Sequence, residues 1–190
     1  GLAELRFLGP AWLLAGLPAL LLAGASFTFW STAGLGTTLF VALVTGAARG
    51  LGRAISLALA DAGADVALGL RNGGDAEDLA AQIEGMGRRA HRVQMDLLDL
   101  AQISRAVEEV RATFGRIDIL CNIAGIGYLK FDSEETPESW NHVISVNLTG
   151  TFYMCQHALP HLLKSQGAIV NCSSTAGTHG APWSAAYSAS

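Results

Sequence analysis

The sequence is poor in charged residues. Only 15 % of its 190 residues are Asp, Glu, Lys or Arg, against roughly 25 % in an ordinary soluble domain. The 12 basic and 16 acidic side chains give a net charge of −4, so the chain lacks the basic surplus that nucleic-acid binding requires. We therefore expect no nucleic-acid partner.

Cysteine is scarce as well. The three residues Cys121, Cys155 and Cys172 are too few, and odd in number, for a disulfide framework, which favours a reducing, cytoplasmic location. His157 and His161 stand four residues apart on a predicted helix, but the nearest extra ligand, Cys155, would point off their face. We expect free thiols and no metal site.

Charge is absent altogether between Arg6 and Arg49. Within this stretch, residues 7–30 are mostly apolar and long enough for the ~20 residues that cross a bilayer. Three interpretations stay open: a transmembrane or signal-anchor helix that attaches the protein to a membrane, a cleaved signal peptide, or a segment foreign to the domain that follows. We assign residues 1–38 to this hydrophobic segment and a flexible linker.

Residues 39–190 alternate short apolar runs with amphipathic stretches. The runs predict five strands, at Leu39–Thr45, Asp65–Leu70, His91–Met95, Ile117–Cys121 and Ala168–Cys172. The helices between them are expected to bury Ile55, Ala58, Leu59 and Ala62, then Leu79, Ile83 and Met86, then Ile103, Val107, Val110 and Phe114. A long helix over 147–164 is expected to be disturbed at Pro160. This alternation predicts an α/β fold, a doubly wound parallel sheet of the Rossmann type.

A glycine-rich turn, TGAARGLG, joins the first predicted strand to the first helix. Gly46, Gly50 and Gly52 permit a tight turn and let the backbone approach a pyrophosphate at the helix N-terminus. No Lys-Ser/Thr pair follows, so the turn is not the phosphate loop of nucleoside triphosphatases. The strand–turn–helix context predicts a dinucleotide site, and the alternative is a tight turn without a ligand.

The end of the second strand bears on the choice of cofactor. NAD-specific domains usually carry an acidic residue there, whereas this chain has Leu70 followed by Arg71. A guanidinium can bind a 2′-phosphate with paired donors, and Arg49 in the glycine turn adds a second positive charge. We predict NADP(H) rather than NAD, the alternative being that both arginines are solvated surface charges.

The glycine turn resembles the TGxxxGxG signature of the short-chain dehydrogenases/reductases, and the chain resembles members of the 3-oxoacyl reductase kind. Further family motifs follow in order over residues 39–190: an Asp after the third strand, Asn122-Ile123-Ala124-Gly125 where the family has NNAG, then SVNLTG and IVNCSSTAG. The resemblance implies cofactor contacts at Gly46, Arg49, Gly50, Leu51, Gly52, Arg71, Asp96, Leu97, Asn122, Ala124 and Gly125.

The resemblance also implies a reaction: hydride transfer between the nicotinamide and the carbonyl or secondary alcohol of a small molecule. Tyr187 would be the acid/base, Ser174 would hold the substrate oxygen, and Asn147 would hold a water in a proton relay. Family members carry a lysine four residues after the tyrosine, which favours the phenolate. This chain stops at Ser190, one residue short. We expect a domain truncated at its C-terminal end, a lysine as the next residue, and little activity from the 190 residues alone.

Substrate and assembly are less specified. Ile126, His179 and Trp183 are expected to border the substrate pocket, with Trp183 suited to an apolar or ring-bearing substrate. The full-length form is expected to be a homo-oligomer, as the resemblance implies. The alternative functions are a non-catalytic nucleotide-binding or membrane-tethered scaffold protein, and a fragment without function.

Overall fold

The computed structural model describes residues 40–190, which contain one parallel sheet. Its strand order is β3-β2-β1-β4-β5, and every neighbouring pair is parallel. The strands are β1 (Val41–Thr45), β2 (Asp65–Leu70), β3 (Ala90–Gln94), β4 (Ile119–Asn122) and β5 (Ala168–Asn171). The chain leaves β1 in one direction and returns to its other side at β4, so the predicted doubly wound, Rossmann-type sheet is confirmed.

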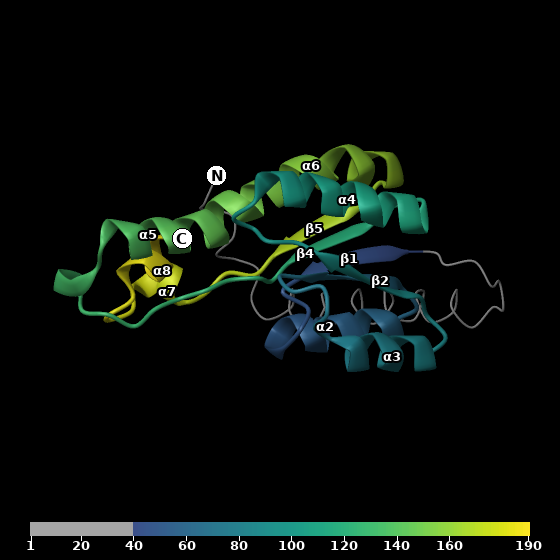
Figure 1. Ribbon diagram of the computed structural model, residues 1–190, viewed down its shortest axis with the longest axis horizontal. Coiled ribbons are helices and arrows are strands. Elements are labelled where there is room, and N and C mark those ends of the chain that lie inside the picture. Colours follow the sequence, from purple (N-terminus) through teal and green to yellow (C-terminus); the bar gives the residue numbers. More distant parts are fainter. Residues whose placement is uncertain (1–39) are drawn as a thin grey trace, which may run out of the picture. The chain divides into compact units, whose positions relative to one another are not determined.

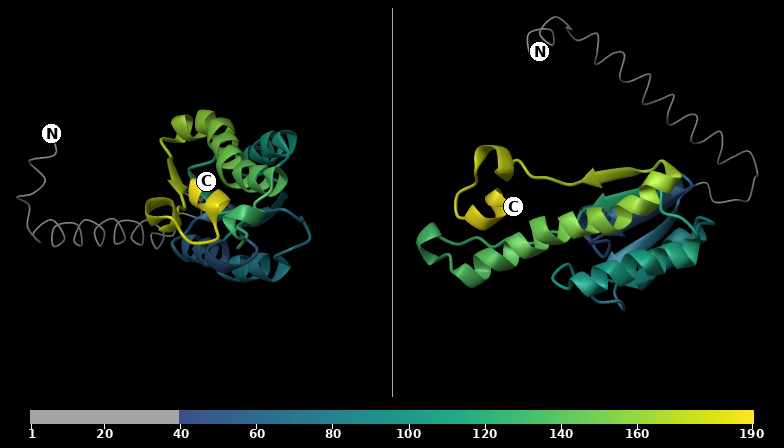
Figure 2. Two further views of the ribbon diagram at one scale, coloured as in Figure 1. Left: turned by 90° about the vertical axis from the view of Figure 1, so that its left-hand side faces the viewer. Right: turned by 90° about the horizontal axis from the view of Figure 1, so that it is seen from above.

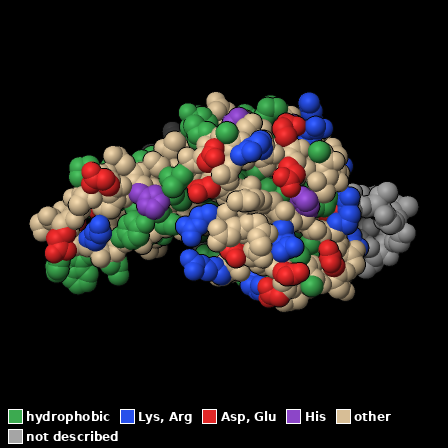
Figure 3. All heavy atoms as spheres, in the orientation of Figure 1, with side chains coloured by type: hydrophobic (Ala, Val, Ile, Leu, Met, Phe, Trp, Pro, Cys, Tyr) green, Lys and Arg blue, Asp and Glu red, His purple; other side chains and the backbone are tan. Residues whose placement is uncertain are grey.

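Helices cover both faces of the sheet (Figures 1 and 2). One face carries α2 (Gly50–Asp61) and α3 (Glu77–Gly85), and the other carries α4 (Leu100–Phe114) and α6 (Thr151–Ser165). Beyond the carboxyl ends of the strands lie α5 (Pro137–Ile144), α7 (Ala176–His179) and α8 (Ala185–Ala189). On the face in Figure 3, basic and acidic side chains are intermixed over the covering helices.

The core consists of two apolar layers, one on each face of the sheet. Strands β1 and β2 are buried along their whole length, as expected of parallel strands covered on both sides. Successive side chains alternate between the layers: Val41 and Leu43 pack towards α4 and α6, and Val44 packs towards α2 and α3. In α4 the predicted inward residues are all buried, namely Ile103, Val107, Val110 and Phe114.

Helix α2 packs on a different face from the predicted one. Its buried positions are three small residues, Gly52, Ser56 and Ala60. Small side chains let the helix axis approach the sheet closely, so the larger Ile55 and Leu59 pack only at the margins. Of the other two residues predicted to be buried, Ala58 is exposed and Ala62 is half-buried.

Helix α3 differs from its prediction at one end. Leu79 and Ile83 are fully buried as predicted, but Met86 is 44 % exposed. The reason is that the helix ends at Gly85 and Met86 forms its C-terminal cap, so its side chain no longer follows the inward face.

The long helix is not disturbed at Pro160, where the sequence predicts a disturbance. It runs from Pro137 to Ser165, and Pro160 lies inside α6 without a break. Pro160 and Gln156, whose carbonyl loses its helical donor, are both exposed, so solvent can take the place of that donor. The irregular turn lies instead at η3 (Ser145–Gly150), a π-helical turn that contains Asn147.

None of the helices between residues 40 and 190 is both long and apolar enough to cross a membrane. The predicted membrane-attachment segment, residues 7–30, and its linker lie outside the described residues. Membrane attachment through that segment stays a prediction.

Candidate functional site

Two adjoining cavities open at the carboxyl edge of the sheet. The first measures about 520 Å³ and is lined by the turns that follow β1, β2, β3 and β4. The second measures about 480 Å³ and is lined by the segments after β4 and β5 together with α8. Five residues line both cavities: Leu51, Ile123, Ala124, Gly125 and Ile126. The crevice where strand order reverses is the usual ligand position in such sheets.

The glycine turn is folded tightly against its neighbours. Gly46 has a φ of +67°, and a Cβ there would stand 2.8 Å from the Cα of Ala124. At Gly52 a Cβ would stand 2.2 Å from the carbonyl oxygen of Gly46. Neither position has room for a side chain, and the backbone of both glycines therefore lies directly at the first cavity. Since no side chain within residues 40–190 caps this helix, its first N–H groups are left for an anion.

Thr45 fixes the turn to β4. It is 1 % exposed, and its Oγ1 accepts hydrogen bonds from the backbone N–H groups of Ile123 (2.9 Å) and Ala124 (3.0 Å). One hydroxyl thus holds the segment that both cavities share. Ile123, which stands where the family motif has its second Asn, makes this hydrogen bond through its backbone N–H.

Ten of the eleven predicted cofactor residues line the first cavity, and the exception is Asn122. Asn122 is 4 % exposed, and its Nδ2 donates to the Oδ1 of Asn171 (2.8 Å) and to the Sγ of Cys155 (3.3 Å). It therefore joins β4 to β5 beneath the cavity. Sequence reasoning missed several lining residues: Ala48, Gly69, Asn72, Asp75, Met95, Leu98, His142 and Val146.

The neighbours of Arg71 could have revealed two of those residues. Asn72 and Asp75 belong to the same loop after β2 as Arg71. Once Arg71 is predicted to reach the cavity, its two loop neighbours are expected to border it too. In contrast, His142 and Val146 come from α5 and the π-helical turn. No local pattern signals their approach to a cavity built by strands far away in the sequence.

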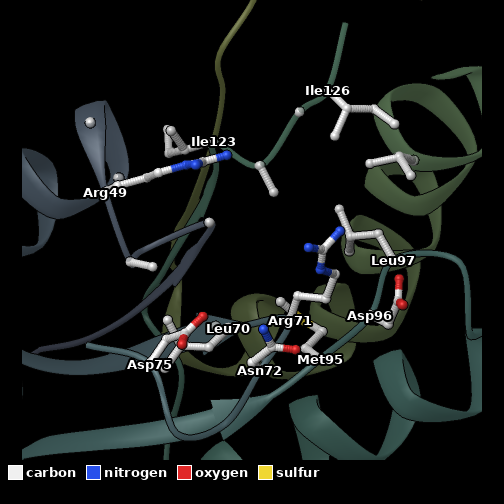
Figure 4. Close-up of a pocket in the computed structure, with 18 of the residues that line it drawn as sticks. Arg49, Leu70, Arg71, Asn72, Asp75, Met95, Asp96, Leu97, Ile123 and Ile126 are labelled. Atoms are coloured by element: carbon white, nitrogen blue, oxygen red, sulfur yellow. The ribbon is translucent and has the colours of Figure 1, made fainter. Parts of the chain in front are cut away.

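Two guanidinium groups reach into the first cavity. Figure 4 shows Arg49 extending across it from the glycine turn and Arg71 standing on the side where β2 ends. Within residues 40–190 neither of them forms an ion pair. The carboxylate of Asp96 lies further along the same wall, where its Oδ1 accepts the backbone N–H of Leu98 (3.0 Å). The cavity therefore offers an anion two free cationic donors.

The three predicted catalytic residues line the second cavity together. Ser174 lies after β5, Tyr187 on α8, and Asn147 in the π-helical turn. Tyr187 is 36 % exposed and Ser174 is half-buried, so both can meet a small molecule. The fold thus brings together residues that lie 40 positions apart in the sequence.

The side-chain amide of Asn147 is largely occupied. Its Oδ1 accepts the backbone N–H of Ile126 (2.9 Å), while its Nδ2 donates to the carbonyl of Ile126 (2.8 Å) and to the Oγ of Ser190 (2.9 Å). Both N–H donors are used, so a relay water could meet this side chain only at the second lone pair of Oδ1.

Of the three residues predicted to border the substrate pocket, Ile126 lines the second cavity. His179 and Trp183 lie outside the lining of the second cavity. Trp183 is 55 % exposed, and its ring packs edge-on against Phe131, with 5.9 Å between centroids. Its backbone carbonyl accepts a hydrogen bond from the N–H of Lys130 (2.8 Å). The residues that form this wall instead are Tyr128 and Leu129.

The cysteines are free thiols, as predicted. Burial raises the pKa of Cys121 and of Cys155, which keeps both thiols protonated and unreactive at neutral pH. Cys172 is exposed and lines the second cavity.

Comparison with known proteins matches residues 40–190 to the family described as short chain dehydrogenase. The chain belongs to this family. It is 45 % identical to D-threitol dehydrogenase of Mycolicibacterium smegmatis over 152 residues, which is 79 % of this chain and 58 % of that one. It is 38 % identical to a 3-oxoacyl-[acyl-carrier-protein] reductase of Thermotoga maritima over 151 residues, 79 % of this chain and 61 % of that one.

A solved structure supports the assignment of this chain to the short-chain dehydrogenase family. A protein described as a short-chain alcohol dehydrogenase, from Sinorhizobium meliloti, superposes with a TM-score of 0.78 at 35 % identity, covering 80 % of this chain and 61 % of that one. The chain thus spans about three fifths of the length of the relatives that it matches.

The Thr45 hydroxyl yields a testable prediction. In Thr45→Val the shape of the side chain is kept but two buried N–H groups lose their acceptor, so we expect the free energy of unfolding to fall by about 2 kcal/mol. Urea unfolding followed by circular dichroism measures this change. Thr45→Ser keeps the hydroxyl and is the matched control, expected to lose much less. Equal losses in the two variants would show that the hydroxyl does not hold the turn.

Proposed function

We propose that the protein is an NADP(H)-dependent oxidoreductase that transfers a hydride between the nicotinamide and a carbonyl or secondary alcohol. The observation that carries this proposal is the joining of the two cavities along residues 123–126. A dinucleotide in the first cavity would thereby present its reactive end to Ser174 and Tyr187 in the second. The relatives' names, which denote an alcohol or a 3-oxo compound, agree with this reaction.

The donor set supports NADP(H) over NAD. The close approach of backbone at Gly46 and Gly52 leaves room for a pyrophosphate at the start of α2. Arg71 occupies the position after β2 where an acidic residue would repel a 2′-phosphate, and Arg49 reaches the cavity from the facing turn. Asp96 and Leu97 would border the adenine.

In this reaction the protein's own residues would donate or accept one proton. The bound dinucleotide supplies or accepts the hydride. Tyr187 would donate a proton to the carbonyl oxygen, or remove one from the alcohol, and Ser174 would hold that oxygen by a hydrogen bond. An unperturbed tyrosine has a pKa near 10, so only about one molecule in a thousand is phenolate at pH 7. A nearby cation would raise that fraction.

Turnover belongs to the complete gene product, because the chain spans about three fifths of its relatives.

Cofactor preference can be measured by fluorescence titration. We expect NADPH to bind at least about tenfold more tightly than NADH, since hydrogen bonds to a charged group contribute roughly 1.5–3 kcal/mol. Arg71→Ala should lower the affinity for NADPH about tenfold and leave NADH nearly unchanged. Arg105→Ala, an exposed arginine of α4, is the control. Equal affinities in the unmodified protein, or tighter NADH, would refute the preference.

The role of Tyr187 can be tested in the complete gene product with a panel of ketones, aldehydes and 3-oxoacyl thioesters. Tyr187→Phe removes the ionisable hydroxyl and keeps the ring, so NADPH oxidation should fall by about a thousandfold or more while the Kd for NADPH stays unchanged. Retained turnover would exclude this tyrosine as the acid/base. NADPH binding without turnover on any substrate would instead favour a nucleotide-binding protein.

We also propose that the protein self-associates through α6. Four apolar side chains, three on α6 and one in the π-helical turn before it, are 45–69 % exposed and spaced 4, 7 and 4 residues apart, which places them along one face: Leu148, Phe152, Leu159 and Leu163. Figure 3 shows hydrophobic side chains along the upper edge of the molecule, over α6.

The stripe on α6 predicts the effect of a single charge. Leu163→Glu should shift the protein towards the monomer in sedimentation velocity runs at micromolar concentration, because it places a carboxylate in an apolar contact. Met86→Glu, an equally drastic change at an exposed methionine of the opposite layer, should leave the oligomer intact. A monomeric unmodified protein would contradict the proposal.

A further inference from the structure

The segment Gly125–Gly127 lies between two of the residues assigned to catalysis. On one side is the amide of Asn147, which makes paired hydrogen bonds with both backbone groups of Ile126. A Cβ built at Gly125 would stand 3.5 Å from the Oδ1 of Asn147, which is ordinary contact. The segment is therefore held against the π-helical turn by the hydrogen bonds of the Asn147 side chain and by ordinary packing contact.

On the other side lies the ring of Tyr187. A Cβ built at Gly127 would stand 3.1 Å from the Cδ2 of Tyr187, 3.3 Å from its Cγ and 3.6 Å from its Cβ. Contacts of 3.1–3.3 Å are tighter than side chains normally tolerate, so the ring rests directly on the glycine backbone. Gly127 has no left-handed φ, so the conformation of the main chain alone does not require glycine here.

We propose that Gly127 is a positioning residue for Tyr187, an inference that rests on the proposed function. Asn147 fixes the backbone of Ile126, the next residue presents a bare backbone surface, and the tyrosine ring is seated on that surface. The absence of a side chain at Gly127 thus sets how close the phenol hydroxyl comes to Ser174 and to the substrate oxygen. Asn147 acts on Tyr187 through the same contacts.

The test is Gly127→Ala in the complete gene product. A methyl group must displace the Tyr187 ring by a few tenths of an ångström, and we expect kcat for NADPH-dependent reduction to fall about tenfold, since misplacement of about 1 Å can cost a hundredfold. The Kd for NADPH should not change, because Gly127 lines only the second cavity. Gly85→Ala, at an open position at the end of α3, is the control and should keep full activity.

A double-mutant cycle separates positioning from a general loss of structure. If Gly127 acts through the hydroxyl of Tyr187, Gly127→Ala should cost nothing further in a Tyr187→Phe background. An equal loss in both backgrounds would overturn the proposal, as would full activity of Gly127→Ala. Urea unfolding of the single variant shows whether it remains folded.

A structural readout distinguishes failure of this inference from failure of the proposed function. In a crystal structure of Gly127→Ala the Tyr187 ring should be shifted away from residue 127 relative to the unmodified protein. An unshifted ring overturns the inference whatever the activity. If the unmodified protein oxidises no NADPH, or if Tyr187→Phe is fully active, the proposed function fails, while the ring shift still reports whether Gly127 seats Tyr187.

Discussion

The junction between β1 and β4 is the constraint on which the rest of the site depends. The buried hydroxyl of Thr45 holds two consecutive N–H groups of the segment after β4, and Gly46 packs against Ala124 at a distance that excludes any side chain. Because the strand order reverses at this junction, the segment after β4 lines both cavities, and the turn after β1 lines mainly the first. A small change here would move the glycine turn and the segment facing Tyr187 together.

Most of the fold could be predicted because its strands are continuous apolar runs separated by helices of regular period. Five strands and the inward face of α4 follow from that pattern alone. The face of α2 could not be predicted in the same way, since its contact with the sheet depends on small residues rather than on large apolar ones. The disturbance of the long helix was predicted at Pro160, but the structure has it at residues 145–150, where hydrogen bonding between Asn147 and Ile126 is a tertiary contact.

The site shows a similar division. Residues that sit at the ends of strands, such as Arg71 and Asp96, follow from their position after a strand, because all parallel strands end at one edge. Asn122 carries a family motif yet points beneath the cavity, towards Asn171 on the neighbouring strand. Contributions from α5 and the π-helical turn depend on how a helix packs over the edge of the sheet, which local sequence does not encode.

The two unpaired arginines of the first cavity have a consequence for which anions can approach. Arg49 and Arg71 make a local cationic region in a recess whose lining also includes the carboxylates of Asp75 and Asp96. At physiological ionic strength, charges are screened over about 8 Å, so that region is felt only by a group already at the mouth of the cavity. A compact phosphate ester can enter the recess and come that near to both guanidinium groups. An anion must therefore be small enough to enter the recess before either arginine attracts it.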